Sequence, residues 1–227
     1  MKEICRIVTA NHRVPLSSVE FALRWGEEKF KRWHKFDKLS QCKEFMRSME
    51  YPDDNTLIKF KDGKHTIPVR FGSAEAMQRY FDEFKPTSMN VVPSAAIVFD
   101  FDVDERTERS CACSGTRSCC DDCWVAIIRP VMQKLLRFCA FMGFKEYQAF
   151  FSGRRGFNIW VLDAPKADKI AKTNLFTRLQ KEWNVTVDRS VLVTNNHLVK
   201  APYMPHQTTG FLALPIDDSF VPSKASK

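Results

Sequence analysis

Two aspartates near the middle of the chain, Asp100 and Asp102, carry side chains suited to binding a divalent cation. They end the run from Ala95 to Val103, which is apolar at first and then alternates, and so predicts a β-strand. Because residues two apart on a strand share a face, both carboxylates project together. Mg²⁺ or Mn²⁺ would neutralise such a pair. The alternative is an acidic strand end in solvent, and Asp104 has the same parity and could replace either residue.

A third carboxylate would have to come from elsewhere in the chain, because phosphoryl transfer with two metal ions uses a cage of several oxygen ligands. Asp188 is a candidate, in a segment that we expect to be a short strand or extended. An isolated aspartate more often caps a helix or faces solvent, so its residue type alone does not decide the role.

A cysteine cluster is the second feature with chemical meaning. Five of the eight cysteines fall between positions 111 and 123, and the amino terminus lacks the apolar core of a signal peptide. We therefore expect an intracellular protein whose clustered thiols bind a metal. Structural zinc is the predicted ligand, with iron–sulfur, disulfides and unliganded thiols as alternatives. The zinc ligands would be Cys111, Cys113, Cys120 and Cys123, with Cys119 as a substitute for Cys120.

A basic turn lies between two predicted strands, at Ser152-Gly153-Arg154-Arg155-Gly156. Its glycines open the backbone and its arginines offer forked donors that match phosphate, so a triphosphate suits it. The alternative is a solvated hairpin turn. Lys200, His206 and Arg70 are further candidates for the same anion, although each in isolation is more often a surface or structural residue.

The elements around these residues indicate an α+β fold, with a mixed β-sheet core and flanking helices. We expect a single domain over residues 1–227, with 105–124 a zinc-binding loop and 217–227 a loose tail. Expected helices are two within 16–49, then 73–84 capped by Ser73, 124–142 and 166–183. Expected strands are a hairpin of 57–60 and 66–71, a central strand at 95–103, then 147–151, 157–162 and 210–216, with 185–188 and 191–194 short strands or extended.

Charge and hydrophobicity narrow the class of partner. The 227 residues include 35 basic and 27 acidic ones, a formal net charge of +8, which suits a polyanion. No apolar run approaches the ~20 residues of a membrane span, so we expect a soluble protein without a membrane partner.

Three of these motifs, in this order, resemble the small catalytic subunit of archaeal and eukaryotic DNA primases. They are Val98 to Asp102, the cysteine cluster ending Cys120-Asp121-Asp122-Cys123-Trp124, and the basic turn. A fourth stretch, from Val187-Asp188 to Asp217, is similar to the family's segment with the last catalytic aspartate and a triphosphate-binding lysine. The resemblance runs from about Arg70 to Asp217.

The resemblance implies a DNA primase that makes primers from nucleoside triphosphates on single-stranded DNA by two-metal nucleotidyl transfer. Its partners would be a primase large subunit or a replication helicase or polymerase. It would act inside the cell at sites of DNA replication, which lie in the nucleus if the source is a cellular eukaryote. The implied metal ligands for Mg²⁺ or Mn²⁺ are Asp100, Asp102 and Asp188. The implied nucleotide contacts are Arg70, Ser152, Arg154, Arg155, Lys200 and His206.

Three departures from the family pattern qualify this expectation. Asn158 stands where the family continues its motif with histidine, which predicts a weaker contact with the triphosphate. The segment His206-Gln207-Thr208-Thr209-Gly210 departs from the family's H-P-K-T-G, and only a short stretch separates Gly156 from Asp188. We therefore expect a shortened primase, of viral or reduced-genome origin. The alternatives are a primase-polymerase that extends primers in repair or damage bypass, and a non-catalytic zinc-containing nucleic-acid-binding module.

Overall fold

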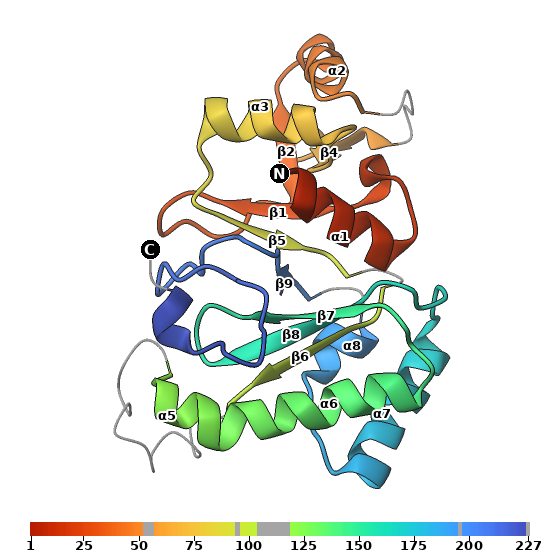
Figure 1. Cartoon of the computed structure of the whole chain (residues 1–227). Helices are drawn as coiled ribbons and strands as arrows, with labels where there is room; N and C mark the ends of the chain where they lie inside the picture. Colours follow the sequence, from red (N-terminus) through yellow and green to blue (C-terminus); the bar gives the residue numbers. More distant parts are fainter. Residues whose placement is uncertain (52–56, 94–95, 104–118, 195–196, 226–227) are drawn as a thin grey trace.

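The computed structural model describes residues 1–51, 57–93, 96–103, 119–194 and 197–225. Helices flank three small sheets of three strands each, in the orders β1-β5-β9, β2-β4-β3 and β6-β8-β7 (Figure 1). This confirms the α+β class. The expected mixed sheet is wrong for the described residues, because every strand pair in these sheets is antiparallel.

The sheet β6-β8-β7 holds the two aspartates predicted to bind metal. Its middle strand is β8, all of whose residues are buried, so the expectation that Asp100 lies on the central strand is wrong. Helix α6 packs on this sheet through Phe138, whose ring centroid lies 6.0 Å from that of Phe99. The bounds are β6 Val98–Asp102, β7 Tyr147–Phe151, β8 Gly156–Val161, α6 Arg129–Phe141 and α7 Lys169–Trp183.

The helix expected at 124–142 is confirmed, with an irregular start. It begins as α5 (Asp121–Cys123), passes through a π-helical turn (Trp124–Ile128) and continues as α6. Pro130 has no N–H group to donate within the helix, which accounts for the wider turn just before it. In that turn the Arg129 N–H donates to the Trp124 carbonyl.

The amino-terminal part differs most from expectation. Of the two helices expected within 16–49, only the second forms, as α2, whereas Phe21–Arg24 and Trp33–Phe36 are strands. Phe21 pairs with Val91 and Trp33 with Pro68. The remaining bounds here are α1 Lys2–His12, β1 Phe21–Arg24, β2 Trp33–Phe36, α2 Leu39–Ser48, β3 Lys59–Lys61, β4 Lys64–Pro68, α3 Ala74–Phe84, β5 Ser88–Val91 and β9 Val199–Lys200.

Two local predictions in this part are confirmed. Strands β3 and β4 form the expected hairpin, with Asp62 and Gly63 at φ values of 54° and 74° in its turn. Helix α3 starts at the expected cap, because the Ser73 hydroxyl oxygen accepts a hydrogen bond from the Ala76 N–H at 3.0 Å.

The carboxyl-terminal part corrects three expectations. The segment after Asp188 is a short helix, α8 (Arg189–Val193), and not extended. The stretch expected as a last strand at 210–216 makes only isolated bridges, such as Phe150 with Pro215. The described part of the tail, residues 217–225, is not loose, since Phe220 is buried and its ring centroid lies 5.1 Å from that of Trp124.

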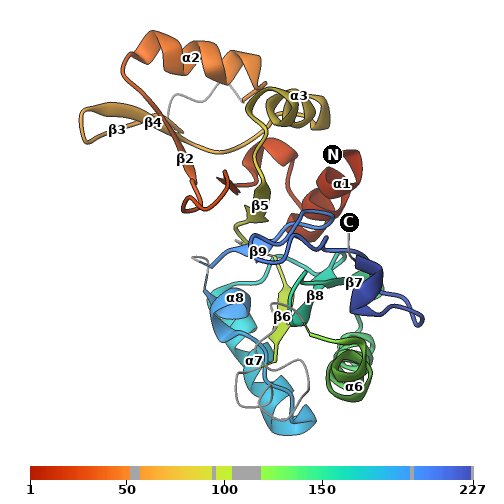
Figure 2. The same ribbon diagram turned by 90° about the vertical axis from the view of Figure 1, so that its left-hand side faces the viewer.

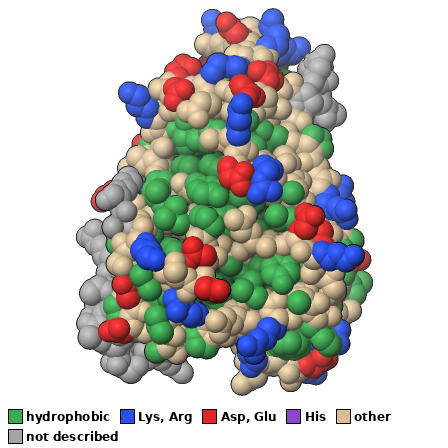
Figure 3. All heavy atoms as spheres, in the orientation of Figure 1, with side chains coloured by type: hydrophobic (Ala, Val, Ile, Leu, Met, Phe, Trp, Pro, Cys, Tyr) green, Lys and Arg blue, Asp and Glu red, His purple; other side chains and the backbone are tan. Residues whose placement is uncertain are grey.

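Two hydrophobic clusters lie within the described residues, one around β1, β5 and α1 and the other around β6, β8 and α6. Helix α1 joins them, because the buried Asn11 side chain donates to the carbonyls of Ile97 (3.0 Å) and Val161 (2.6 Å). On the face in Figure 3, hydrophobic side chains gather across the middle and basic ones lie mostly toward the edges. No helix in the described part of the chain is both long and apolar enough to cross a membrane.

Candidate active site

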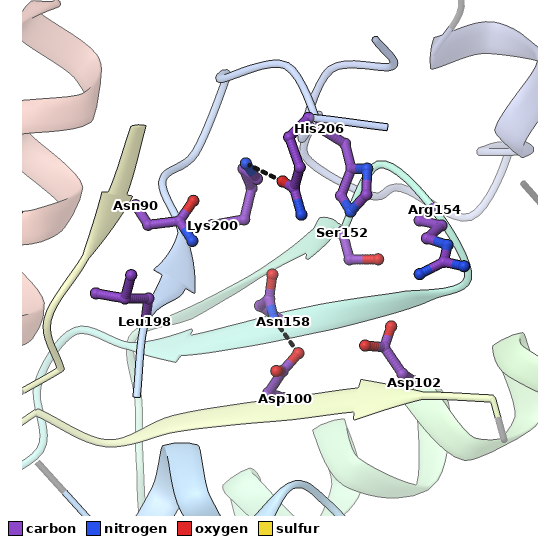
Figure 4. A pocket seen from close by; sticks show the side chains of 10 residues that line it. Asn90, Asp100, Asp102, Ser152, Arg154, Asn158, Leu198, Lys200 and His206 are labelled. Carbon is purple, nitrogen blue, oxygen red and sulfur yellow. Dashed lines mark hydrogen bonds between the residues drawn. The ribbon is translucent and has the colours of Figure 1, made fainter. Parts of the chain in front are cut away.

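A pocket of about 230 Å³ opens where β5, β6, β8 and β9 meet the basic turn (Figure 4). The carboxylates lie along β6 on one side, and the basic side chains face them from the turn and from β9 and the loop that follows it. The lining residues are Asn90, Asp100, Asp102, Ser152, Arg154, Asn158, Leu198, Lys200, His206 and Gln207.

The acidic side of the pocket is built by the pairing of β6 with β8. Asp100 lies opposite Asn158 and Asp102 opposite Gly156, so both carboxylates point into the pocket as the alternation predicts. The Asn158 amide nitrogen donates to Asp100. A Cβ atom at Gly156 would overlap the Phe101 carbonyl and the Asp102 carboxylate. Only glycine therefore lets the two strands approach closely enough here.

The surroundings of the two carboxylates disfavour their charged forms. Burial, then repulsion from Asp102 and Asp188, raises the pKa of Asp100 well above its ordinary value. Burial also raises the pKa of Asp102, against the opposing effect of Arg154. This side of the pocket therefore favours a proton or a cation beside the carboxylates.

Asp188 also lies in this region, but it begins a helix, whereas we expected a short strand or an extended segment. It is the N-cap of α8, and its Oδ1 accepts hydrogen bonds from the Ser190 N–H (2.7 Å) and hydroxyl (2.5 Å). Its own N–H donates to the Asp100 carbonyl at 2.7 Å. Within the described ranges, no group of three or more His, Cys, Asp or Glu side chains is arranged to hold a metal. Asp188 is thus adjacent to the aspartate pair, with its carboxylate engaged in a helix cap.

The basic turn packs against the segment around His206. Gly153 has φ +86°, and a Cβ there would come within 2.6 Å of the His206 Cβ, so this position requires glycine on both counts. The Thr209 hydroxyl donates to the Gly153 carbonyl at 2.5 Å, and the Gly156 N–H donates to the Ser152 hydroxyl oxygen at 3.2 Å. These contacts hold Arg154 at the edge of the pocket.

Lys200 and His206 complete the basic side. The buried Lys200 ammonium donates to the Ser88 hydroxyl at 2.6 Å and to the Gln207 side-chain oxygen at 3.0 Å. Burial, with a smaller effect of Arg24, lowers the pKa of Lys200 to about 7. Burial and nearby cations, Lys200 first, lower the pKa of His206 to about 4. His206 is therefore neutral at physiological pH.

Most of the predicted site residues come together in this pocket, and a few do not. Arg155 lies beside it, where its carbonyl accepts from the Val103 N–H at 3.2 Å. Arg70 is outside the pocket lining and pairs with Glu20 at 3.2 Å. Sequence reasoning missed Asn90, Leu198 and Gln207. Of these three residues, Gln207 could have been noticed in the sequence. It follows the predicted nucleotide contact His206, in the segment that differs from the H-P-K-T-G motif.

The cysteine prediction is only partly within the described residues. Cys111, Cys113 and most of the 105–124 loop lie outside them, so the zinc site stays a prediction. Cys120 caps the short helix α5, where its sulfur accepts from the Cys123 N–H at 3.4 Å. Cys5, Cys42 and Cys139 are buried, as expected of ordinary core thiols.

Comparison with known proteins first defines the fold. The chain aligns over 95% of its length, with a TM-score of 0.54 and 15% identity, to the polymerase domain of Mycobacterium tuberculosis ligase D solved in complex with DNA, and covers 79% of that domain. No protein-family model matches the chain.

The chain is also similar in sequence to a subunit of a DNA primase. Over 115 residues, 48% of this chain, the sequence is 32% identical to the DNA primase small subunit of Saccharomyces cerevisiae, of which the match spans 26%. These two similarities relate the chain to a polymerase domain by its fold and, over about half of its length, to a DNA primase small subunit by its sequence.

Proposed function

We propose that the chain is a DNA-directed nucleotidyltransferase that makes primers from nucleoside triphosphates on a single-stranded DNA template. The observation that carries this proposal is the pocket itself, where the pair Asp100 and Asp102 faces Arg154 and Lys200. A triphosphate needs cationic donors along its phosphates, and a phosphoryl-transfer centre needs clustered carboxylates for divalent metal. The pocket brings both requirements within one cavity.

The donor chemistry of the acidic side fits Mg²⁺ or Mn²⁺. The carboxylates of Asp100 and Asp102 share a face, and the Asn90 and Asn158 side-chain oxygens are buried without a hydrogen-bond partner among the described residues. Hard divalent cations prefer such oxygens. Asp100 and Asp102 would hold the metal, and Asp188 would complete the set. A divalent cation bound there would neutralise the carboxylates and phosphate oxygens and would make the attacking hydroxyl more acidic.

The protein's own residues would position the nucleotide. Arg154 offers a planar fork to two phosphate oxygens, and the Ser152 hydroxyl adds a neutral donor. Lys200 supplies a point charge, and neutral His206 supplies one ring N–H donor. With the nucleotide held in this way, the 3′-hydroxyl oxygen of the primer or first nucleotide attacks the α-phosphorus and its proton passes to water. The new P–O bond forms as the bond from the α-phosphorus to the oxygen that bridges to the β-phosphate breaks, and pyrophosphate leaves on the basic side.

Further components belong to the same proposal. A structural zinc ion on Cys111, Cys113, Cys120 and Cys123 would stabilise the loop beside α5 without taking part in the chemistry. A large primase subunit, or a replication helicase or polymerase, would be the protein partner, at sites of DNA replication.

The test is primer synthesis without a primer. Purified protein is incubated with single-stranded DNA, labelled nucleoside triphosphates and Mg²⁺ or Mn²⁺, and oligomers are resolved on a gel. We expect products from the wild type and none from Asp100→Ala/Asp102→Ala, with zinc content and circular dichroism unchanged. The matched control Asp82→Ala/Asp218→Ala, which removes two exposed aspartates, should retain activity. Full incorporation by the Asp100/Asp102 variant would contradict the proposal.

A second candidate is a polymerase that mainly extends primers, which the shared fold with a ligase polymerase domain favours. The same templates with an annealed primer distinguish the two. Strict dependence on the supplied 3′ end would select the extending enzyme. Template binding without any incorporation would select a non-catalytic module and overturn both catalytic candidates.

A further inference from the structure

The sheet β2-β4-β3 has one covered face and one open face. Helix α2 covers the first, where the Phe45 ring centroid lies 4.6 Å from that of His34 and 5.3 Å from that of Phe36. Figure 2 shows α2 on this side and no described helix on the other. Side chains of Trp33 and Lys35 alternate with those of His34 and Phe36, so they belong to the open face.

Strand register gathers lysines on this open face. Lys35 pairs with Thr66 and Thr66 with Lys59, which sets two lysines in one row across three strands. Lys61 and Lys64 are paired in the next row on the same face. Like charges on neighbouring strands repel, so this arrangement costs stability unless a partner compensates it. Two carboxylates offset part of the charge, since Asp37 pairs with Lys64 at 3.2 Å and Asp62 lies in the turn.

One aromatic side chain lies among these lysines, because the Lys59 ammonium sits 5.3 Å from the centroid of the Trp33 ring. Phe60 is 68% exposed, but it pairs with His65 and so belongs to the other face of the sheet. Trp33 and the lysines border a hollow of about 460 Å³. Its lining residues are Trp33, Lys35, Lys59, Phe60, Lys61, Asp62 and Thr66, none of which lines the candidate active site.

We propose that this open face, with Trp33, Lys35 and Lys59 at its centre, binds single-stranded nucleic acid and holds the template strand outside the active site. Exposed aromatic rings stack on bases of any sequence, and lysines beside them contact the phosphates that link those bases. An acidic protein segment would use the lysines but would have no base to stack on Trp33. The identification of the strand as template rests on the proposed function, whereas binding itself does not.

Binding of a fluorescein-labelled oligothymidylate of about 15 nucleotides tests the proposal, in EDTA and without nucleotide, over a series of salt concentrations. Each phosphate contact on a single strand contributes about 0.7 to the slope of log affinity against log salt. We expect Lys35→Ala/Lys59→Ala to reduce that slope by about 1.4. Trp33→Leu, which keeps an apolar side chain without an extended π face, should weaken binding about tenfold.

The matched control is Lys2→Ala/Lys43→Ala, which removes two exposed lysines from α1 and α2 and should leave affinity and slope unchanged. Thermal melts establish that each variant folds. Unchanged DNA binding in both open-face variants would overturn the inference while leaving primer synthesis untouched. An equal loss of affinity for oligothymidylate and for polyglutamate in Trp33→Leu would also overturn it, because the face would then select charge alone. Retained binding by a wild type that makes no product would sink the proposed function only.

Discussion

The surroundings of Asp100 and Asp102 disfavour the charged form of both carboxylates. Burial raises the pKa of both, so each contributes stability that is fully present below the ordinary Asp pKa of 3.8 and is lost as pH rises through the folded-state pKa. We expect the free energy of unfolding, measured by urea titration in EDTA, to fall as pH rises above about 4. Asp100→Asn should flatten this decline, by about 1.4 kcal/mol per unit of pKa shift removed.

Adding Mg²⁺ separates the metal effect from the proton effect. The wild type should gain stability at neutral pH, because a cation compensates both charges, whereas Asp100→Asn should gain less. An identical response of the two proteins would show that the aspartate pair binds no metal.

Lys200 gives the pocket a pH dependence of its own. With a pKa near 7, its ammonium is charged below that pH and neutral above it, while His206, with a pKa near 4, is neutral throughout. Triphosphate affinity should therefore decline as pH rises through about 7, by about tenfold for one charge-assisted hydrogen bond. Lys200→Arg should abolish that decline, since arginine stays charged. Fluorescent-nucleotide titrations at several pH values provide the measurement.

Asn158 is the site residue whose type departs from the family motif. Its amide donates to Asp100, and its oxygen is buried without a partner in the described part of the chain. A histidine there would be held by the same carboxylate and could carry charge toward a phosphate. We expect Asn158→His to bind nucleoside triphosphate several-fold more tightly in the same titrations, consistent with a hydrogen bond to a charged group. No gain in affinity would refute this explanation of the departure.

The sequence predicted site residues where chemistry and local pattern coincided. Asp100, Asp102 and the basic turn all follow from one strand alternation and one hairpin, and the structure brings them together. Asn90 and Leu198 could not be found in this way, because an amide or a leucine carries no signal until strand pairing brings it to the pocket. Arg70, which we expected on a hairpin strand, lies beyond the end of β4, and there its guanidinium pairs with Glu20.

At the scale of elements, β6 and β8 can lie this close together only because Gly156 has no side chain. Gly156→Ala would force its Cβ into the Phe101 carbonyl, and backbone cannot swing away as a flexible side chain can. We expect a loss of about 1–3 kcal/mol or more in urea unfolding, with loss of incorporation. The control Gly63→Ala has open space around it and should cost about 1 kcal/mol through its positive φ alone. Equal costs for the two variants would contradict the strand-contact explanation.

Elements whose structure depends on neighbouring residues were predicted well. Elements whose structure depends on partners far away in the sequence were not. The hairpin turn at Asp62-Gly63 and the helix cap at Ser73 both follow from residues within one turn or one cap. Phe21–Arg24 and Trp33–Phe36 were misassigned because their aromatic residues recur near helical spacing. Their strand state is decided by β5 and β4, which are far away in the sequence. Asp188 was misassigned because a cap and a strand end look alike without the helix that follows.

At the scale of the whole molecule, the carboxyl terminus closes one of the two hydrophobic clusters. Phe220 packs on Trp124 and Phe151, and its carbonyl accepts from the Arg129 guanidinium at 2.7 Å. We expect Phe220→Ala to lower the free energy of unfolding by about 3–5 kcal/mol. Phe60→Ala, at a mostly exposed phenylalanine, should stay within about 0.5 kcal/mol. Chemical denaturation of both variants is the measurement, and similar values would mean that the terminus is as loose as the sequence suggested.

The sheet of three strands that carries the aspartates has both outer strands already in contact with other parts of the chain. Beyond β7, the Ile216 N–H donates to the Ala149 carbonyl, and beyond β6 the Asp188 N–H donates to the Asp100 carbonyl. Backbone groups on both outer strands are therefore already hydrogen-bonded within the chain, which hinders pairing with a strand from a second molecule. The hairpin edge at β3 has no such cover among the described residues, and there Lys59 and Lys61 oppose strand addition by charge. The sheet that carries Asp100 and Asp102 is thus protected from edge-to-edge aggregation by its own chain, whereas the hairpin of β3 and β4 relies on the charge of its lysines.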